Sequence, residues 1–191
     1  EYDKAPFYAA LGYERHLDYF GLGAIAPAGQ AVPVAAIGGS PSASSRDTGL
    51  KLVGRYGFGK TRLGLIYEQL EYTQDNSAAA ATVFKSYRRN AYALTATHEV
   101  GPGTVRAIYG RANGGRCSLV GSGACIASAL GAQQISLGYS HKYSDRTDLY
   151  GFYTRVANDA NATYQFANAA GIGAAAGAAS VGYLMGIRHT F

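Results

Sequence analysis

The feature that most constrains this chain is a strict alternation of apolar and polar residues, repeated in short stretches along the sequence. It is clearest from Gln133 to Tyr143, where Ile, Leu, Tyr, His and Tyr alternate with Gln, Ser, Gly, Ser and Lys. Successive side chains of a β-strand point to opposite faces, so this pattern predicts strands with one apolar face and one polar face.

The alternating stretches all have a similar length. A tilted strand needs about nine to eleven residues to cross the apolar core of a membrane, and the stretches match that length. The sequence therefore predicts a single all-β unit over residues 1–191, with strands near residues 7–18, 49–59, 61–72, 90–100, 104–112, 133–143, 147–156 and 181–191.

The predicted connections alternate between short and long. Tight turns are expected at Gly59-Lys60, Gly101-Pro102-Gly103 and Ser144-Asp145-Arg146, because glycine, proline and aspartate favour turns. Long connections are expected between them, over residues 20–47, 74–88, 114–132 and 158–180. Short turns at one end and long loops at the other are typical of a transmembrane antiparallel up-and-down β-barrel, with the short turns in the periplasm.

The composition agrees with alternation. Hydrophobic residues make up 48% of the 191 residues, yet the mean hydropathy is only -0.07. No run approaches the roughly 18 apolar residues of a membrane-spanning helix. A soluble β-sandwich also alternates, but the alternating connection lengths and the aromatic ends of the strands argue against it. The net charge of +5 comes from scattered residues, which disfavours nucleic-acid binding.

Charged residues of the predicted strands fall mainly on the polar face. One such charge on a lipid-facing wall costs ~2–4 kcal/mol near the midplane, whereas in a water-filled lumen it stays hydrated and acts on passing ions. We therefore predict that the polar face lines a pore. The basic pore-lining residues are Lys51, Arg55, Arg62, Arg106, Lys142 and Arg188, and the acidic ones are Glu14, Glu68, Glu99 and Asp148.

Aromatic residues recur where the predicted strands meet the short turns. Phe7, Phe58, Tyr143 and Phe191 are expected to face outward and to form a girdle at the lipid interface. His98, His141 and His189 lie on the same face near strand ends, and we interpret them as hydrogen-bonded interfacial residues rather than metal ligands.

The two cysteines lie eight residues apart in a segment rich in glycine and serine. In an oxidising compartment Cys117 and Cys125 are expected to form a disulfide, and the alternative is a pair of free thiols. Their spacing fits no metal site. Residues 54–61 match the phosphate-binding pattern G-x-x-x-x-G-K-[ST], but a strand rather than a helix follows, so a hairpin turn is the better interpretation.

Three segments carry a resemblance to a known family. The end of the chain, VGYLMGIRHTF at 181–191, resembles the terminal strand of bacterial outer-membrane barrels and, in GIRHTF, general porins of the betaproteobacterial type. HKYSDRTDLY at 141–150 resembles the penultimate hairpin of that family, and YDKAPFY at 2–8 resembles one of its mid-barrel hairpins.

The resemblance covers the whole chain but only the C-terminal half of the family. It implies sixteen-stranded homotrimers in the outer membrane, in contact with lipid and lipopolysaccharide. It also implies an arginine ladder opposite an acidic inserted loop, a role carried here to Arg55, Arg62 and Arg106. The terminal strand implies a signal for the barrel-assembly machinery, at Tyr183, Ile187 and Phe191.

Two arrangements stay open at this point. Either the chain supplies eight strands of a wide porin barrel, or it closes into an eight-stranded barrel of its own. Small barrels have interiors filled by side chains, and this polar face would leave such an interior under-packed, which favours the wide barrel. The wide barrel implies passive diffusion of small hydrophilic solutes and ions, with at most a weak anion preference. The small barrel implies a non-conducting role in adhesion or envelope structure. No enzyme activity, cofactor or metal is predicted.

Overall fold

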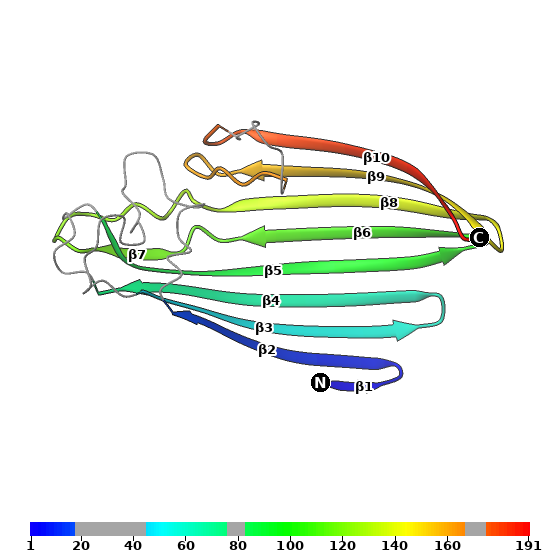
Figure 1. Cartoon of the computed structure of the whole chain (residues 1–191), viewed down its shortest axis with the longest axis horizontal. Helices are drawn as coiled ribbons and strands as arrows, with labels where there is room; N and C mark the ends of the chain where they lie inside the picture. Colours follow the sequence, from blue (N-terminus) through cyan, green and yellow to red (C-terminus); the bar gives the residue numbers. More distant parts are fainter. Residues whose placement is uncertain (18–44, 76–82, 167–174) are drawn as a thin grey trace.

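The computed structural model describes residues 1–17, 45–75, 83–166 and 175–191. Within these ranges the chain forms one antiparallel sheet, whose long strands lie side by side (Figure 1). None of the described residues belongs to a helix long and apolar enough to span a membrane. The strands are β1 (Tyr2–Lys4), β2 (Phe7–Leu17), β3 (Ser45–Phe58), β4 (Thr61–Gln74), β5 (Phe84–Val100), β6 (Gly103–Ala112), β7 (Arg116–Leu119), β8 (Ala132–Ser144), β9 (Thr147–Asn158) and β10 (Ala179–His189).

The strands follow one another across the sheet in nearly the order of the sequence. The order is β1-β2-β3-β4-β5-β6-β8-β9-β10, and β7 pairs with the first part of β5. The tight turns join β3 to β4, β5 to β6 and β8 to β9 at one end of the sheet, on the right in Figure 1. Gly59 and Gly101 each have φ of 54°, a conformation that glycine adopts without the steric cost of a side chain.

The sheet has ten strands, which corrects the expectation of eight. Each of the eight predicted ranges overlaps a strand, and the two additional strands, β1 and β7, have only three and four residues, too few to show alternation. β5 begins at Phe84 rather than near residue 90. The sequence did not predict its first residues as a strand, because polar side chains stand on both faces there and apolar residues do not alternate. β10 ends at His189 rather than at Phe191. Parts of three predicted long connections (residues 18–44, 76–82 and 167–174) lie outside the described residues.

The strand register separates the sheet into an apolar and a polar face. Across β2 to β5, Leu11, Leu52, Tyr67 and Tyr92 form one row of facing residues. The next row, one residue along each strand, contains Gly12, Lys51, Glu68 and Ala91. Adjacent rows point to opposite faces, so a slip of one residue would exchange the two faces completely.

The sheet is open. β1 pairs with β2 and β10 pairs with β9, and in the part of the chain that the structure describes these two edges do not pair with each other. Figure 1 shows them at opposite sides of the sheet. The described chain therefore does not close into a small eight-stranded barrel. Each edge presents a row of unpaired backbone groups that a further strand can complete.

Buried side chains gather at the end of the sheet opposite the tight turns. Phe84 and Tyr87 of β5 pack there with Leu119, Ala127 and Leu130. The Tyr87 hydroxyl donates a hydrogen bond to the Gly114 carbonyl oxygen at 2.8 Å. This cluster holds the segment with β7 against the sheet, whereas most large apolar side chains of the strands remain exposed.

Candidate functional site

The polar face of the sheet collects the charged residues that the sequence predicted to line a pore. The registers of successive strand pairs place them on one face, although they come from eight strands. Most are partly or fully exposed. The residues are Glu14, Lys51, Arg55, Arg62, Glu68, Glu99, Arg106, Lys142, Asp148 and Arg188.

Two of the three arginines of the predicted ladder share a row. Arg62 of β4 faces Thr97 of β5, which in turn faces Arg106 of β6. Arg55 lies two rows away and so on the same face, where its guanidinium stacks 4.8 Å from the centre of the Tyr8 ring. The three arginines therefore lie close to the tight-turn end of the sheet rather than being spread along its length.

Some cations of this face form an ion pair with a carboxylate and others do not. Lys51 Nζ lies 2.9 Å from Glu68, Arg62 lies 3.7 Å from Glu99, and Lys142 Nζ lies 2.8 Å from Asp145. These pairs are largely exposed, so each contributes little to stability. The hydrogen bond from Lys142 holds the pKa of the turn residue Asp145 below its ordinary value.

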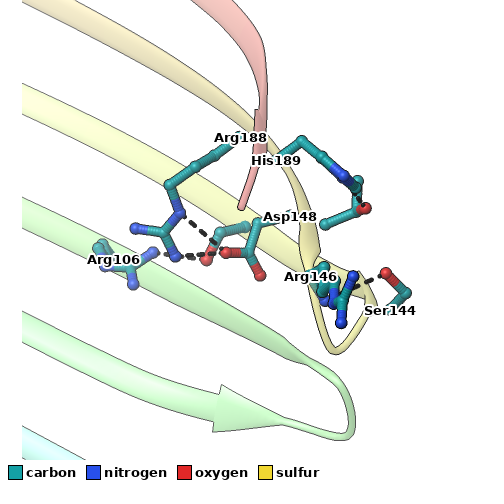
Figure 2. A network of polar contacts seen from close by, with 8 residues as sticks. Arg106, Ser144, Arg146, Asp148, Arg188 and His189 are labelled. Atoms are coloured by element: carbon teal, nitrogen blue, oxygen red, sulfur yellow. Dashed lines mark hydrogen bonds and ion pairs between the residues drawn. The ribbon is translucent and has the colours of Figure 1, made fainter. Parts of the chain in front are cut away.

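Figure 2 shows the polar contacts at the turn between β8 and β9. Arg188 forms an ion pair with Asp148, and the Arg146 backbone N–H donates to the Ser144 hydroxyl at 3.3 Å. Arg106 points into the same region, where it donates a hydrogen bond to the Ser140 hydroxyl at 2.8 Å.

Arg55 and Arg106 are the two ladder arginines without an ion pair among the described residues. Their charges are therefore not offset by a neighbouring carboxylate of this sheet.

Arg89 is a further cation of the polar face that the sequence did not reveal. It faces Leu70 near the end of the sheet opposite the tight turns, and its guanidinium stacks 5.2 Å from the Tyr164 ring centre. Its Nε and Nη1 are buried and have no hydrogen-bond partner within the described part of the chain. Arg89 falls between the predicted connection over residues 74–88 and the predicted strand near residues 90–100, so no alternation pointed to it.

Comparison with known proteins identifies the family. Residues 1–161 match the family profile of Gram-negative porins. The chain belongs to the Gram-negative porin family. The porin chain is also similar in structure to the anion-selective porin from Comamonas acidovorans, with 25% sequence identity and a TM-score of 0.68. That match covers 100% of this chain and 47% of the Comamonas porin, and no match was found among curated proteins.

The family and the fold place the porin in the outer membrane as part of a β-barrel. The chain spans less than half the length of the Comamonas porin, and its open sheet corresponds to a segment of that barrel. The apolar face is then the face that contacts lipid, because a barrel of this kind alternates lipid-facing apolar residues with polar residues inside.

Aromatic rings cluster at the turn end of the lipid-facing side. Phe7 and Tyr56 have ring centres 4.8 Å apart, and Tyr56 and Phe58 have centres 5.9 Å apart. Phe191 packs against His189, with ring centres 4.9 Å apart, and Tyr143 is 74% exposed. The predicted role of Phe7, Phe58, Tyr143 and Phe191 as an interfacial girdle is consistent with these positions and stays a prediction.

A second set of aromatic residues, which the sequence analysis missed, lies further from the turns on the same face. Tyr92 and Tyr109 have ring centres 6.3 Å apart, and Tyr153 and Tyr183 have centres 5.4 Å apart. Amphipathic tyrosine rings suit the membrane interface. The sequence signal was available, because a tyrosine follows at the same spacing after four of the turns, at Tyr13, Tyr67, Tyr109 and Tyr153.

The three histidines on the lipid-facing side near strand ends all have hydrogen bonds. His98 Nδ1 lies 2.8 Å from the Thr61 hydroxyl, and His189 Nδ1 lies 2.9 Å from the Thr147 hydroxyl. His141 is bonded to a tyrosine hydroxyl of its own strand at 3.2 Å. Their interpretation as hydrogen-bonded residues is confirmed, and the described residues contain no cluster that could hold a metal ion.

The residues of the predicted assembly signal lie on or beyond the edge strand. Tyr183 and Ile187 point to the lipid-facing side of β10 and are well exposed, and Phe191 lies two residues beyond the strand. β10 is an open edge of the sheet, so its backbone groups remain available to a pairing strand. Recognition by the assembly machinery stays a prediction.

The structure joins Cys117 of β7 to Cys125 by a disulfide, with their Cα atoms 5.8 Å apart. The bond closes a short loop beside the buried cluster of Phe84, Tyr87 and Leu130. β7 pairs only with the first part of β5, beyond the stretch in which apolar residues alternate with polar ones. The disulfide therefore stabilises the loop end of the porin rather than its membrane-spanning wall.

We expect a charge on the lipid-facing side to destabilise the barrel more than the same charge on the polar side. Leu94→Arg places a guanidinium in lipid and should lower the free energy of unfolding by about 2–4 kcal/mol. Ala93→Arg, its neighbour on the other face, is the matched control and should have a small effect. The measurement is the urea midpoint of the full protein in lipid vesicles, and equal midpoints for both variants would show that the two faces are wrongly assigned.

Loss of the disulfide should loosen the loop and leave the wall intact. In the double variant Cys117→Ser and Cys125→Ser, local stability should fall by about 2–3 kcal/mol, the entropy of an uncrosslinked loop of this length. Trypsin should then cut after Arg116 faster, as followed by mass spectrometry, while the urea midpoint of the barrel stays unchanged. Ser122→Ala in the same loop is the control, and a large fall of the barrel's midpoint would contradict the expectation.

Proposed function

We propose that this porin chain forms part of the wall of a water-filled channel through which small hydrophilic solutes and ions cross the outer membrane by passive diffusion. The observation that carries the proposal is the placement of ten charged residues on one face of a sheet whose other face carries mostly apolar side chains along the alternating stretches. A face with this many charges requires water beside it.

The channel is wider than these strands alone can enclose. The sheet is open at β1 and β10, and edges of this kind cannot face lipid because their backbone groups would lack hydrogen bonds. The similar Comamonas porin has about twice the length of this chain, since the match covers 47% of it. We infer that further strands complete the barrel, and that it assembles as a homotrimer in contact with lipopolysaccharide after recognition by the barrel-assembly machinery.

Anion preference is the finer part of the proposal. Six of the ten charged residues are basic and four are acidic, and Arg55 and Arg106 have no ion pair among the described residues. Fixed positive charges beside an ion path attract anions and repel cations. The Comamonas porin carries the description anion-selective, which supports the same direction here. Diffusion of this kind needs neither a catalytic step nor a cofactor.

Conductance in a planar bilayer tests the channel itself. Protein extracted from its native membrane should give large open steps, and steps in groups of three would indicate a trimer. Absence of steps, or only small flickering ones, would favour a non-conducting barrel with a role in adhesion or envelope structure.

Charge reversal of Arg55 and Arg106, the two ladder arginines without an ion pair in the described part of the chain, tests the anion preference. Arg55→Glu together with Arg106→Glu should shift the reversal potential in a salt gradient toward cation preference, because both charges change sign beside the ion path. Arg46→Glu with Arg88→Glu changes the total charge equally at positions that register on the opposite face. If the control pair shifts the potential as much as the first pair, the assignment of the ion path to the polar face is wrong.

A further inference from the structure

The polar face contains an apolar patch beside Arg106, which has no ion pair among the residues that the structure describes. Arg106 shares a row with Gly138, Phe152 and Leu184 across β6, β8, β9 and β10. Phe152 is 36% exposed and Leu184 is 56% exposed, although they lie on the face that carries the charges. Large apolar side chains on a water-facing wall lose the stabilisation of burial, so their presence beside a cation calls for a physical explanation.

Glycines shape this patch. The Phe152 ring lies over Gly138 and the Tyr150 ring lies over Gly186, so that neither glycine has room for a Cβ atom. The ring centres of Tyr150 and Phe152 are 6.0 Å apart. Each ring is thereby laid along the wall, where a flat ligand can pack against it.

A hollow of 530 Å³ lies over these residues at the tight-turn end of the sheet. Its lining includes Phe152, Tyr150 and three cations, of which Arg188 is engaged by Asp148 and Lys142 by Asp145. Arg106 donates from Nη1 to the Ser140 hydroxyl and has no carboxylate partner in the described ranges. A guanidinium has five N–H donors, so the others remain available to a ligand in the hollow.

We propose that this hollow is a subsite for small aromatic monocarboxylates. The carboxylate accepts hydrogen bonds from Arg106, and the ring packs against Phe152 and Tyr150. Arg188 and Lys142 already have carboxylate partners, and Arg106 is the one cation of the hollow's lining without one in the described ranges, so a single carboxylate fits better than a multivalent anion. This subsite proposal rests on the proposed channel function. It specifies one class of solute that binds transiently to the channel wall during diffusion.

Block of the ion current by sodium benzoate tests the subsite, with sodium acetate at the same ionic strength as the ligand without a ring. In the native porin, benzoate should reduce the current at a concentration about two- to tenfold lower than acetate, the range that one aromatic contact supplies. Equal blocking concentrations for benzoate and acetate would overturn the proposal.

Two variants separate the ring contact from the charge contact. Phe152→Leu keeps an apolar side chain but removes one of the two rings, so the blocking concentration of benzoate should rise toward that of acetate while that of acetate stays unchanged. Arg106→Gln should raise the blocking concentrations of both. Arg55→Gln removes the same charge elsewhere on the face and should leave the benzoate-to-acetate ratio as in the native porin. Retention of the native ratio in Phe152→Leu would overturn the proposal.

Saturation-transfer NMR on the detergent-solubilised porin tests binding of benzoate independently of ion conduction, so that failure of the subsite proposal can be distinguished from failure of the channel proposal. Transfer to the benzoate ring protons, lost in Phe152→Leu, supports the subsite whether or not the protein conducts. Conductance with anion preference but without benzoate transfer leaves the channel function standing and eliminates the subsite.

Discussion

The hydrogen-bonded register between neighbouring strands is the constraint on which the rest of this porin depends. The pairings from β2 to β6 and from β8 to β10 run for ten or more residues, with one irregularity, near the turn between β8 and β9. Side chains alternate with a period of two, so each pairing fixes which residues meet lipid and which meet water. A slip of one residue would turn arginines such as Arg55, Arg62 and Arg106 toward lipid, at a cost that rises from ~0–1 kcal/mol near the interface to ~2–4 kcal/mol at the midplane.

The same constraint explains which parts of the fold the sequence predicts. The alternation of residues 133–143 and its seven counterparts identifies the long strands, because each has one apolar and one polar face. The alternation does not predict the start of β5, where Lys85 and Arg88 place charged side chains on both faces of the strand. It fails again for β7, whose four residues are held by the Cys117–Cys125 disulfide and a local cluster rather than by a continuous pattern.

The sequence predicts which face of the sheet each charged residue lies on better than it predicts which charged residues form ion pairs. The alternation assigns Arg55 and Arg106 to the polar side. Only the three-dimensional contacts show that, within the described ranges, neither has the carboxylate partner that Lys51 and Arg62 have. Partners such as Glu68 and Glu99 come from neighbouring strands, and the register that brings them together is set by hairpin geometry rather than by composition.

Pairing also decides how much each charge matters for ions in the channel. An exposed pair such as Lys51 and Glu68 has nearly zero net charge at a distance beyond its own separation, and salt screens what remains within about 8–10 Å. An unpaired guanidinium keeps its full charge over the same distance. Near Arg106, the cations Arg188 and Lys142 form ion pairs with Asp148 and Asp145. The count of six basic against four acidic residues therefore understates the local effect of the Arg106 charge on ions. Selectivity at the turn end thus follows from the arrangement of ion pairs more than from net charge.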